Sequence, residues 1–135
     1  MEKKSQISIE YLVLFAFLSF VLISILSVAF FYSAAIKDRL KMTQVNNFAN
    51  KIISTAETVF YYGSPSQATI RVYVPDGVND ILLSSEGMII TTQLNSGVSK
   101  MLFSSDTVLE GNMSATAGVH YVVIAAREDR VVITS

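Results

Sequence analysis

Few side chains in this chain could do chemistry, and Glu10 is the one whose position is most informative. It stands directly before residues 11–36, a stretch without a single charged side chain. An ionised carboxylate is costly inside a membrane, about 2.5–3.5 kcal/mol at the bilayer centre, so it needs a cationic partner or access to water. Two roles follow. Glu10 either pairs with a positive charge, or it marks a membrane boundary by reaching the polar surface.

Catalytic chemistry lacks the residues that it needs. There is no cysteine, which excludes thiolate nucleophiles, disulfides and cysteine-based metal sites. The single histidine, His120, lies in a strand-like run, where a structural or surface role is expected. The acidic pairs Asp76/Asp80 and Glu128/Asp129 lie at predicted turns, and the first does not have the spacing of a calcium loop. We therefore predict no enzyme: no catalytic, cofactor-binding or metal-ligating residues, and no cofactor. The net charge of −1, with no basic patch, also excludes nucleic acid as an expected partner.

The residues in front of Glu10 form a short motif. Lys3 and Lys4 make a basic head, the small residue Ser5 follows, and Gln6 begins the run QISIEY that leads into the apolar stretch. This pattern resembles the class III signal peptide of archaeal type IV pilin-like proteins, with Ser5 where the family usually has glycine. The resemblance implies that a membrane prepilin peptidase cuts between Ser5 and Gln6. Residues 1–5 would then be a leader peptide, and the apolar segment would stay on the mature protein.

The resemblance also implies a role for Glu10. Cleavage would create a positively charged α-amine on Gln6, and subunits of this family are thought to use such a glutamate to attract the N-terminus of a neighbouring subunit. Gln6 and Glu10 are thus the expected assembly residues. The expected partners are further copies of the chain packed through the N-terminal helix, the prepilin peptidase, the pilus assembly machinery and, before assembly, the membrane.

The apolar segment itself suits a membrane span. As a helix, about 26 residues extend roughly 39 Å, more than the roughly 30 Å of a hydrocarbon core. A secretory signal peptide is the competing interpretation, because Ser33-Ala34-Ala35 offers small residues to signal peptidase. The segment is, however, longer than the usual apolar region of about 7–15 residues. Three basic residues follow the segment and two precede it, so charge alone favours the reverse orientation. The leader-like motif requires a cytoplasmic N-terminus, which is the orientation we expect.

Beyond Ile36 the apolar residues become periodic. A spacing of three to four residues makes one apolar stripe on a helix, here formed by Leu40, Val45, Phe48, Ile52, Ala56 and Val59. The glycine and proline of Gly63-Ser64-Pro65 end the helix. We predict one long helix over residues 6–62, with a membrane or filament-core half (6–36) and an amphipathic half (37–62). The stripe is expected to pack on the chain's own β domain or on other copies of the chain.

From Gln67 the apolar period changes to two, which predicts an antiparallel β head domain over residues 67–135. Residues 75–78 are a predicted turn, and further strands are expected at 81–83, 88–94, 100–103, 107–109, 119–126 and 130–134. The fold class is therefore α+β: a long N-terminal helix followed by a small antiparallel sheet or sandwich, as in type IV pilins. The sequon Asn112-Met113-Ser114 lies in a predicted loop and makes Asn112 the candidate N-glycosylation site.

The sequence thus predicts a structural subunit of an archaeal type IV pilus-like surface filament, with adhesion as an expected role. The subunit would be held in the cell membrane before assembly and would lie in an extracellular filament afterwards. The alternative is a single-pass membrane-anchored surface protein whose β domain binds a ligand or partner without polymerising. A third interpretation is a secreted soluble domain that begins near Ile36.

Overall fold

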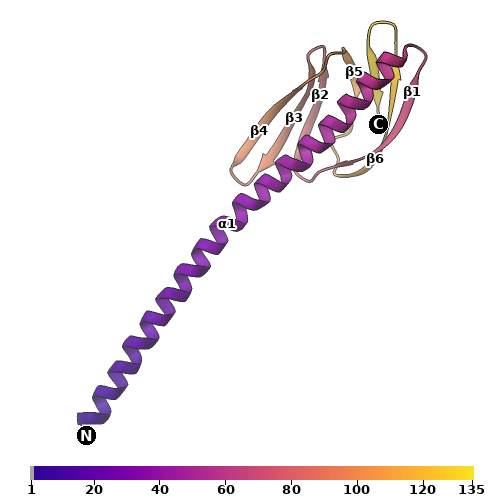
Figure 1. Cartoon of the computed structure of the whole chain (residues 1–135). Helices are drawn as coiled ribbons and strands as arrows, with labels where there is room; N and C mark the ends of the chain where they lie inside the picture. Colours follow the sequence, from indigo (N-terminus) through magenta and orange to yellow (C-terminus); the bar gives the residue numbers. More distant parts are fainter. Residues whose placement is uncertain (1) are drawn as a thin grey trace. The chain divides into compact units, whose positions relative to one another are not determined.

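The structure is a computed structural model that describes the backbone of residues 2–135 and the side chains from Ser8 onward. In this range one helix precedes seven strands (Figure 1). Their bounds are α1 (Glu2–Tyr62), β1 (Gln67–Val74), β2 (Val78–Ser84), β3 (Gly87–Leu94), β4 (Gly97–Ser104), β5 (Leu109–Asn112), β6 (Gly118–Ala126) and β7 (Val131–Thr134). The predicted α+β class is confirmed. Contacts divide the chain into two units, Met1–Lys37 and Asp38–Ser135, so α1 contributes to both.

The first unit is a helical segment whose apolar side chains are uncovered. From Ile9 to Ile36 its large apolar residues are exposed, with exposed fractions from 36% at Val21 to 81% at Phe31. Ser24 and Ser27 each donate their hydroxyl to the carbonyl four residues earlier at 2.8 Å, which removes the cost of a free hydroxyl in an apolar helix. The segment is long and apolar enough to cross a membrane.

The second unit begins with the amphipathic part of α1, which buries one face. The buried residues recur at intervals of one and three, as on one side of a helix: Val45, Phe48, Ala49, Ile52, Ile53, Ala56 and Val59. Leu40 was expected in this stripe but is 57% exposed, so that prediction is wrong. The helix around Leu40 contacts the end of β3 and the turn after it through polar groups, where no strand interior covers an apolar side chain.

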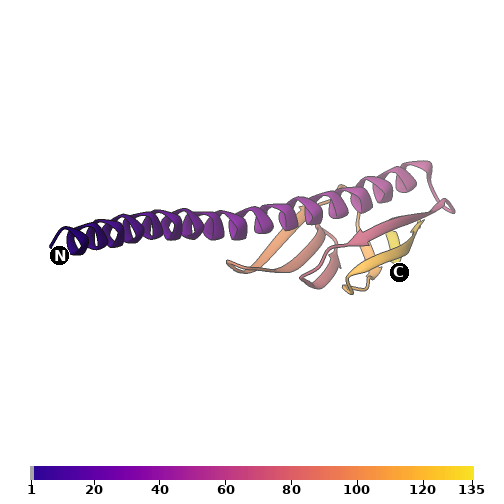
Figure 2. The ribbon, with the colours of Figure 1, turned by 90° about the horizontal axis from the view of Figure 1, so that it is seen from below.

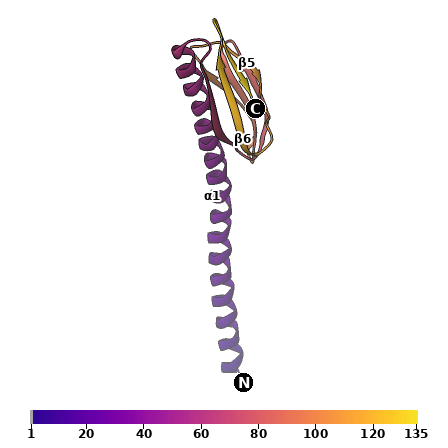
Figure 3. The same cartoon turned by 90° about the vertical axis from the view of Figure 1, so that its right-hand side faces the viewer.

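The strands form two sheets, ordered β1-β6-β7-β5 and β2-β3-β4. Within unit 2 both sheets lie on the same side of α1 (Figures 2 and 3). Strand residues that alternate along each strand face the helix and form one core with its buried stripe, among them Val72, Ile90, Leu109, Val122 and Ile133. All described strand pairs are antiparallel except β5 with β7, which is parallel. That parallel pair departs from the purely antiparallel expectation, because β6 separates its two strands in sequence.

Several strand boundaries also differ from the prediction, and β2 begins at Val78, inside the predicted turn, rather than at residue 81. β4 begins at Gly97 rather than at residue 100, because it pairs with β3 along its whole length, up to Leu94 opposite Gly97. β5 begins at Leu109 and ends at Asn112, whereas residues 107–109 were expected. The hydroxyl of Thr107 lies 3.3 Å from that of Ser105 in the preceding loop, so Thr107 belongs to that loop and not to the strand.

Candidate functional site

The predicted processing and assembly residues lie at the start of α1. The backbones of Ser5 and Gln6 are helical, but their side chains lie outside the described residues. The side chain of Glu10 is described and exposed. Ile9, Val13, Leu14 and Phe17 line an open groove beside Glu10 along the helix surface.

This groove gives Glu10 an apolar neighbourhood on its own helix. A carboxylate among apolar side chains has little to hydrogen-bond, so covering this surface with lipid or protein would leave a charge that needs compensation. A cation brought to Glu10 by another molecule would supply it. The geometry therefore agrees with either a charge pair at this position or contact with water at a membrane surface.

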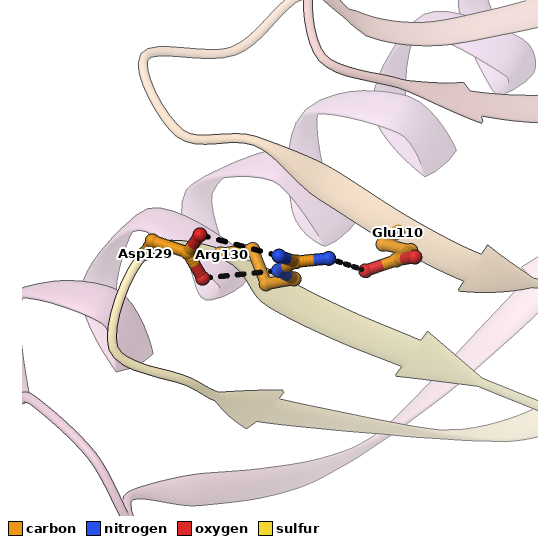
Figure 4. Close-up of polar contacts among 3 residues, drawn as sticks. All are labelled: Glu110, Asp129 and Arg130. Atoms are coloured by element: carbon orange, nitrogen blue, oxygen red, sulfur yellow. Dashed lines mark hydrogen bonds and ion pairs between the residues drawn. The ribbon is translucent and has the colours of Figure 1, made fainter.

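The strongest charge cluster lies elsewhere, between β5 and the turn before β7 (Figure 4). Arg130 donates to Glu110 at 2.7 Å through Nη1, and to Asp129 at 3.0 Å through Nε and 3.2 Å through Nη2. The hydrogen bonds to Asp129 and Glu110 raise the pKa of Arg130, and the hydrogen bond from Arg130 lowers the pKa of Asp129. Since β5 and β7 are parallel neighbours, this cluster ties their ends together and is structural.

The remaining candidates for chemistry stay apart from one another. His120 Nε2 lies 2.7 Å from the carbonyl oxygen of Thr116, a contact that holds the loop before β6. Within the part of the chain that the structure describes, no three of the His, Cys, Asp and Glu side chains gather closely enough to hold a metal ion.

Asn112 lies at the end of β5 rather than in a loop as predicted, and its side chain is exposed. The sequon continues into the segment after the strand, where the backbone N–H of Ser114 donates to the hydroxyl of Ser135 at 2.9 Å. An exposed acceptor at the end of a short strand is accessible for modification, so Asn112 stays a candidate site.

A polar contact that sequence reasoning missed fixes the start of unit 2. Asp38 on α1 accepts the N–H groups of Asn95 at 2.9 Å and Ser96 at 3.2 Å, together with the Asn95 side-chain amide at 2.8 Å. The backbone hydrogen bond from Asn95 lowers the pKa of Asp38 below its ordinary value of 3.8. No local pattern signals this contact, because its partners lie more than 50 residues away in the sequence.

Two further side chains of α1 reach backbone groups in the same way. Lys41 Nζ donates to the carbonyl oxygen of Gln93 at 3.4 Å, and Glu57 accepts the N–H of Asp106 at 3.2 Å. Asp38 and Lys41 lie before the apolar stripe and Glu57 lies near its end, so polar contacts to both ends of the β2-β3-β4 sheet flank the stripe. The rotation of this part of α1 on the strands is therefore fixed.

No protein-family model, curated protein or solved structure matches this chain. Its function is therefore inferred from its residues and their geometry alone.

Proposed function

We propose that the chain is a structural subunit of an archaeal type IV pilus-like surface filament. A prepilin peptidase removes residues 1–5, the subunit waits in the membrane with its N-terminus in the cytoplasm, and the assembly machinery then packs its N-terminal helix against those of other copies. The role is structural and not catalytic. Adhesion is the activity that we assign to the finished filament.

The exposed apolar surface of α1 is the observation that carries this proposal. Large side chains from Ile9 to Ile36 are exposed on every side of the helix, and each apolar Å² left in water costs about 25 cal/mol. A soluble monomer could not tolerate such a surface. Lipid covers this surface before assembly, and a bundle of identical helices covers it in a filament. The same segment therefore suits a pilin subunit both in the membrane and in the filament.

Glu10 supports assembly over simple anchoring. A membrane anchor does not require a carboxylate among Ile9, Val13 and Leu14, whereas a subunit that is recruited through its neighbour's N-terminal amine needs one there. Once apolar helices surround the charge pair between Glu10 and the amine, water is excluded and the attraction between the two charges becomes stronger. Glu10 therefore contributes to recruitment more than to the stability of a single subunit.

The first experiment is the N-terminal sequence and intact mass of the protein recovered from cells that produce it. We expect the chain to start at Gln6. A Ser5→Gly variant should be processed as well or better, and Ser5→Leu should accumulate uncut. A start near Ile36 would identify a secreted domain, and an uncut N-terminus on the wild-type chain would contradict the proposed processing.

The second experiment tests assembly. Cells that carry Glu10→Ala should process the chain normally but yield no filaments after shearing, as judged by electron microscopy. Glu86→Ala is the matched control, because it removes the same charge from an exposed turn between β2 and β3 and should leave filaments intact. Normal filaments from Glu10→Ala would contradict the role of Glu10. If even the wild-type chain forms only detergent-soluble monomers, the alternative of a non-polymerising membrane-anchored protein replaces the proposal.

A further inference from the structure

β1 is a free edge of the four-stranded sheet. All eight of its residues are paired with β6, and among the described strands none lies on its other side. On an antiparallel edge strand, the N–H and C=O groups of every second residue point away from the sheet and lack a strand partner. A groove of about 240 Å³ runs beside this edge, between β1 and α1, and is lined by Gln44, Asn47, Phe48, Lys51, Val72 and Tyr73.

Two cations flank this edge, one on each face of the sheet. Lys51 is exposed on the groove side, where its Nζ donates to the carbonyl oxygen of Arg71 at 2.8 Å. The side chain of Arg71 is exposed on the opposite face, because burial alternates along β1 and its neighbour Val72 faces the core. The ion pairs of the described residues all involve Arg130, so neither Lys51 nor Arg71 is paired with a carboxylate among them.

We propose that this edge binds an extended acidic segment of a partner protein by adding it as a further strand beside β1. The backbone of the segment would pair with the free N–H and C=O groups of β1, which is a common way for sheets to bind peptides. Consecutive side chains of a strand point to opposite faces. Two adjacent acidic residues would therefore reach Lys51 on the groove side and Arg71 on the outer side.

The charges also indicate what the partner is not. Of the other edge strands, β2 and β5 lie against each other, whereas β4 carries the exposed residue Lys100 at its middle. Joining β4 of one copy to β1 of another would bring Lys100 close to Lys51 and Arg71, and like charges on adjacent strands are destabilising. An acidic segment has the opposite effect, because Lys51 would exchange a neutral carbonyl for a carboxylate, which makes a stronger, charge-assisted hydrogen bond.

A labelled peptide tests this inference on the full chain in detergent micelles. The probe is an end-capped eight-residue peptide of valine and threonine with two adjacent glutamates at its centre, and binding is measured by fluorescence anisotropy. We expect saturable binding that falls at least 10-fold in Lys51→Glu and in Arg71→Glu. Lys100→Glu is the matched control, since it makes the same charge change on the other edge strand and should leave the affinity unchanged.

Two altered peptides separate strand addition from simple charge attraction. Replacing both glutamates by lysines should abolish binding, and methylating alternate backbone nitrogens along one edge should do the same while keeping the charges. No binding of the glutamate peptide, equal binding of the methylated peptide, or equal loss of affinity in Lys100→Glu would each overturn the inference. The inference does not depend on filament assembly, because the assay uses dispersed chains.

Discussion

Replacing Thr92 by valine should stabilise the β domain, because the fully buried side chain of this β3 residue has a hydroxyl without a hydrogen-bond partner among the described residues. Valine has nearly the same shape, with a methyl group in place of the hydroxyl. Burying an unsatisfied hydroxyl costs about 1–3 kcal/mol. We expect the free energy of unfolding to rise by about 1–2 kcal/mol, and each kcal/mol raises the melting temperature of a domain of this size by about 4–8 °C.

Thr107 provides the matched control for Thr92. It is also buried, with an exposed fraction of 5%, but its hydroxyl lies 3.3 Å from that of Ser105 and shares a hydrogen bond with it. Thr107→Val would leave the Ser105 hydroxyl with one partner fewer, so we expect a loss of about 1 kcal/mol. The same chemical change should therefore have opposite signs at the two positions.

Urea unfolding of the full chain in detergent measures both effects, followed by tyrosine fluorescence because the chain has no tryptophan. The urea midpoint should move up for Thr92→Val and down for Thr107→Val, with the same dependence on urea in each case. A Thr92→Val variant that is less stable than the wild type would refute the reasoning. The hydroxyl would then have a stabilising partner, such as a buried water molecule.

Two further predictions concern single contacts in unit 2. Gly87→Ala should be more destabilising than Gly97→Ala by about 1–3 kcal/mol in the same urea assay. Both glycines have a positive φ, but an added Cβ at Gly87 would collide with the carbonyl of Phe103, whereas at Gly97 it meets nothing within 4 Å. Equal losses of stability in the two variants would contradict this. The hydrogen bond that lowers the pKa of Asp38 contributes stability above its ordinary value of 3.8, and that stability is lost as pH falls through the lowered folded-state pKa. The urea concentration at the unfolding midpoint should therefore decrease in the wild type as the pH is lowered below about 4, and it should decrease less in Asp38→Asn. Identical pH profiles would contradict a role for Asp38.

Local patterns were sufficient for most of the fold. The change from a continuous apolar run to a period near 3.6, and then to a period of two, predicted the long helix and the strand-rich domain because each period matches the geometry of one element. The pairing of β5 with β7 had no such signal. These strands are parallel and short, so their pairing depends on tertiary contacts, among them the ion pair between Arg130 and Glu110.

Candidate site residues could be predicted only where their role depends on neighbours in the sequence. Glu10 could be selected as a candidate because its predicted role depends on the apolar residues next to it in sequence. Lys51 and Asp38 could not be predicted, because the role of each depends on a backbone group that the fold brings near. Lys51 donates to the carbonyl of Arg71, and Asp38 accepts the N–H of Asn95. A lysine and an aspartate on the polar side of an amphipathic helix are otherwise ordinary solvated residues.

Lysines at the edge strands β1 and β4 connect the fold to the proposed assembly. A subunit that polymerises through its N-terminal helix brings many copies of the β domain close together, and free strand edges at high local concentration promote uncontrolled pairing. Lys51 covers an edge carbonyl of β1, and Lys100 places a charge at the middle of β4. Both devices discourage pairing between copies, which carry the same positive charges. Because Lys51 and Arg71 are cations, a strand of opposite charge would turn this barrier into an attraction, so the residues that keep copies apart are also those that would select an acidic partner.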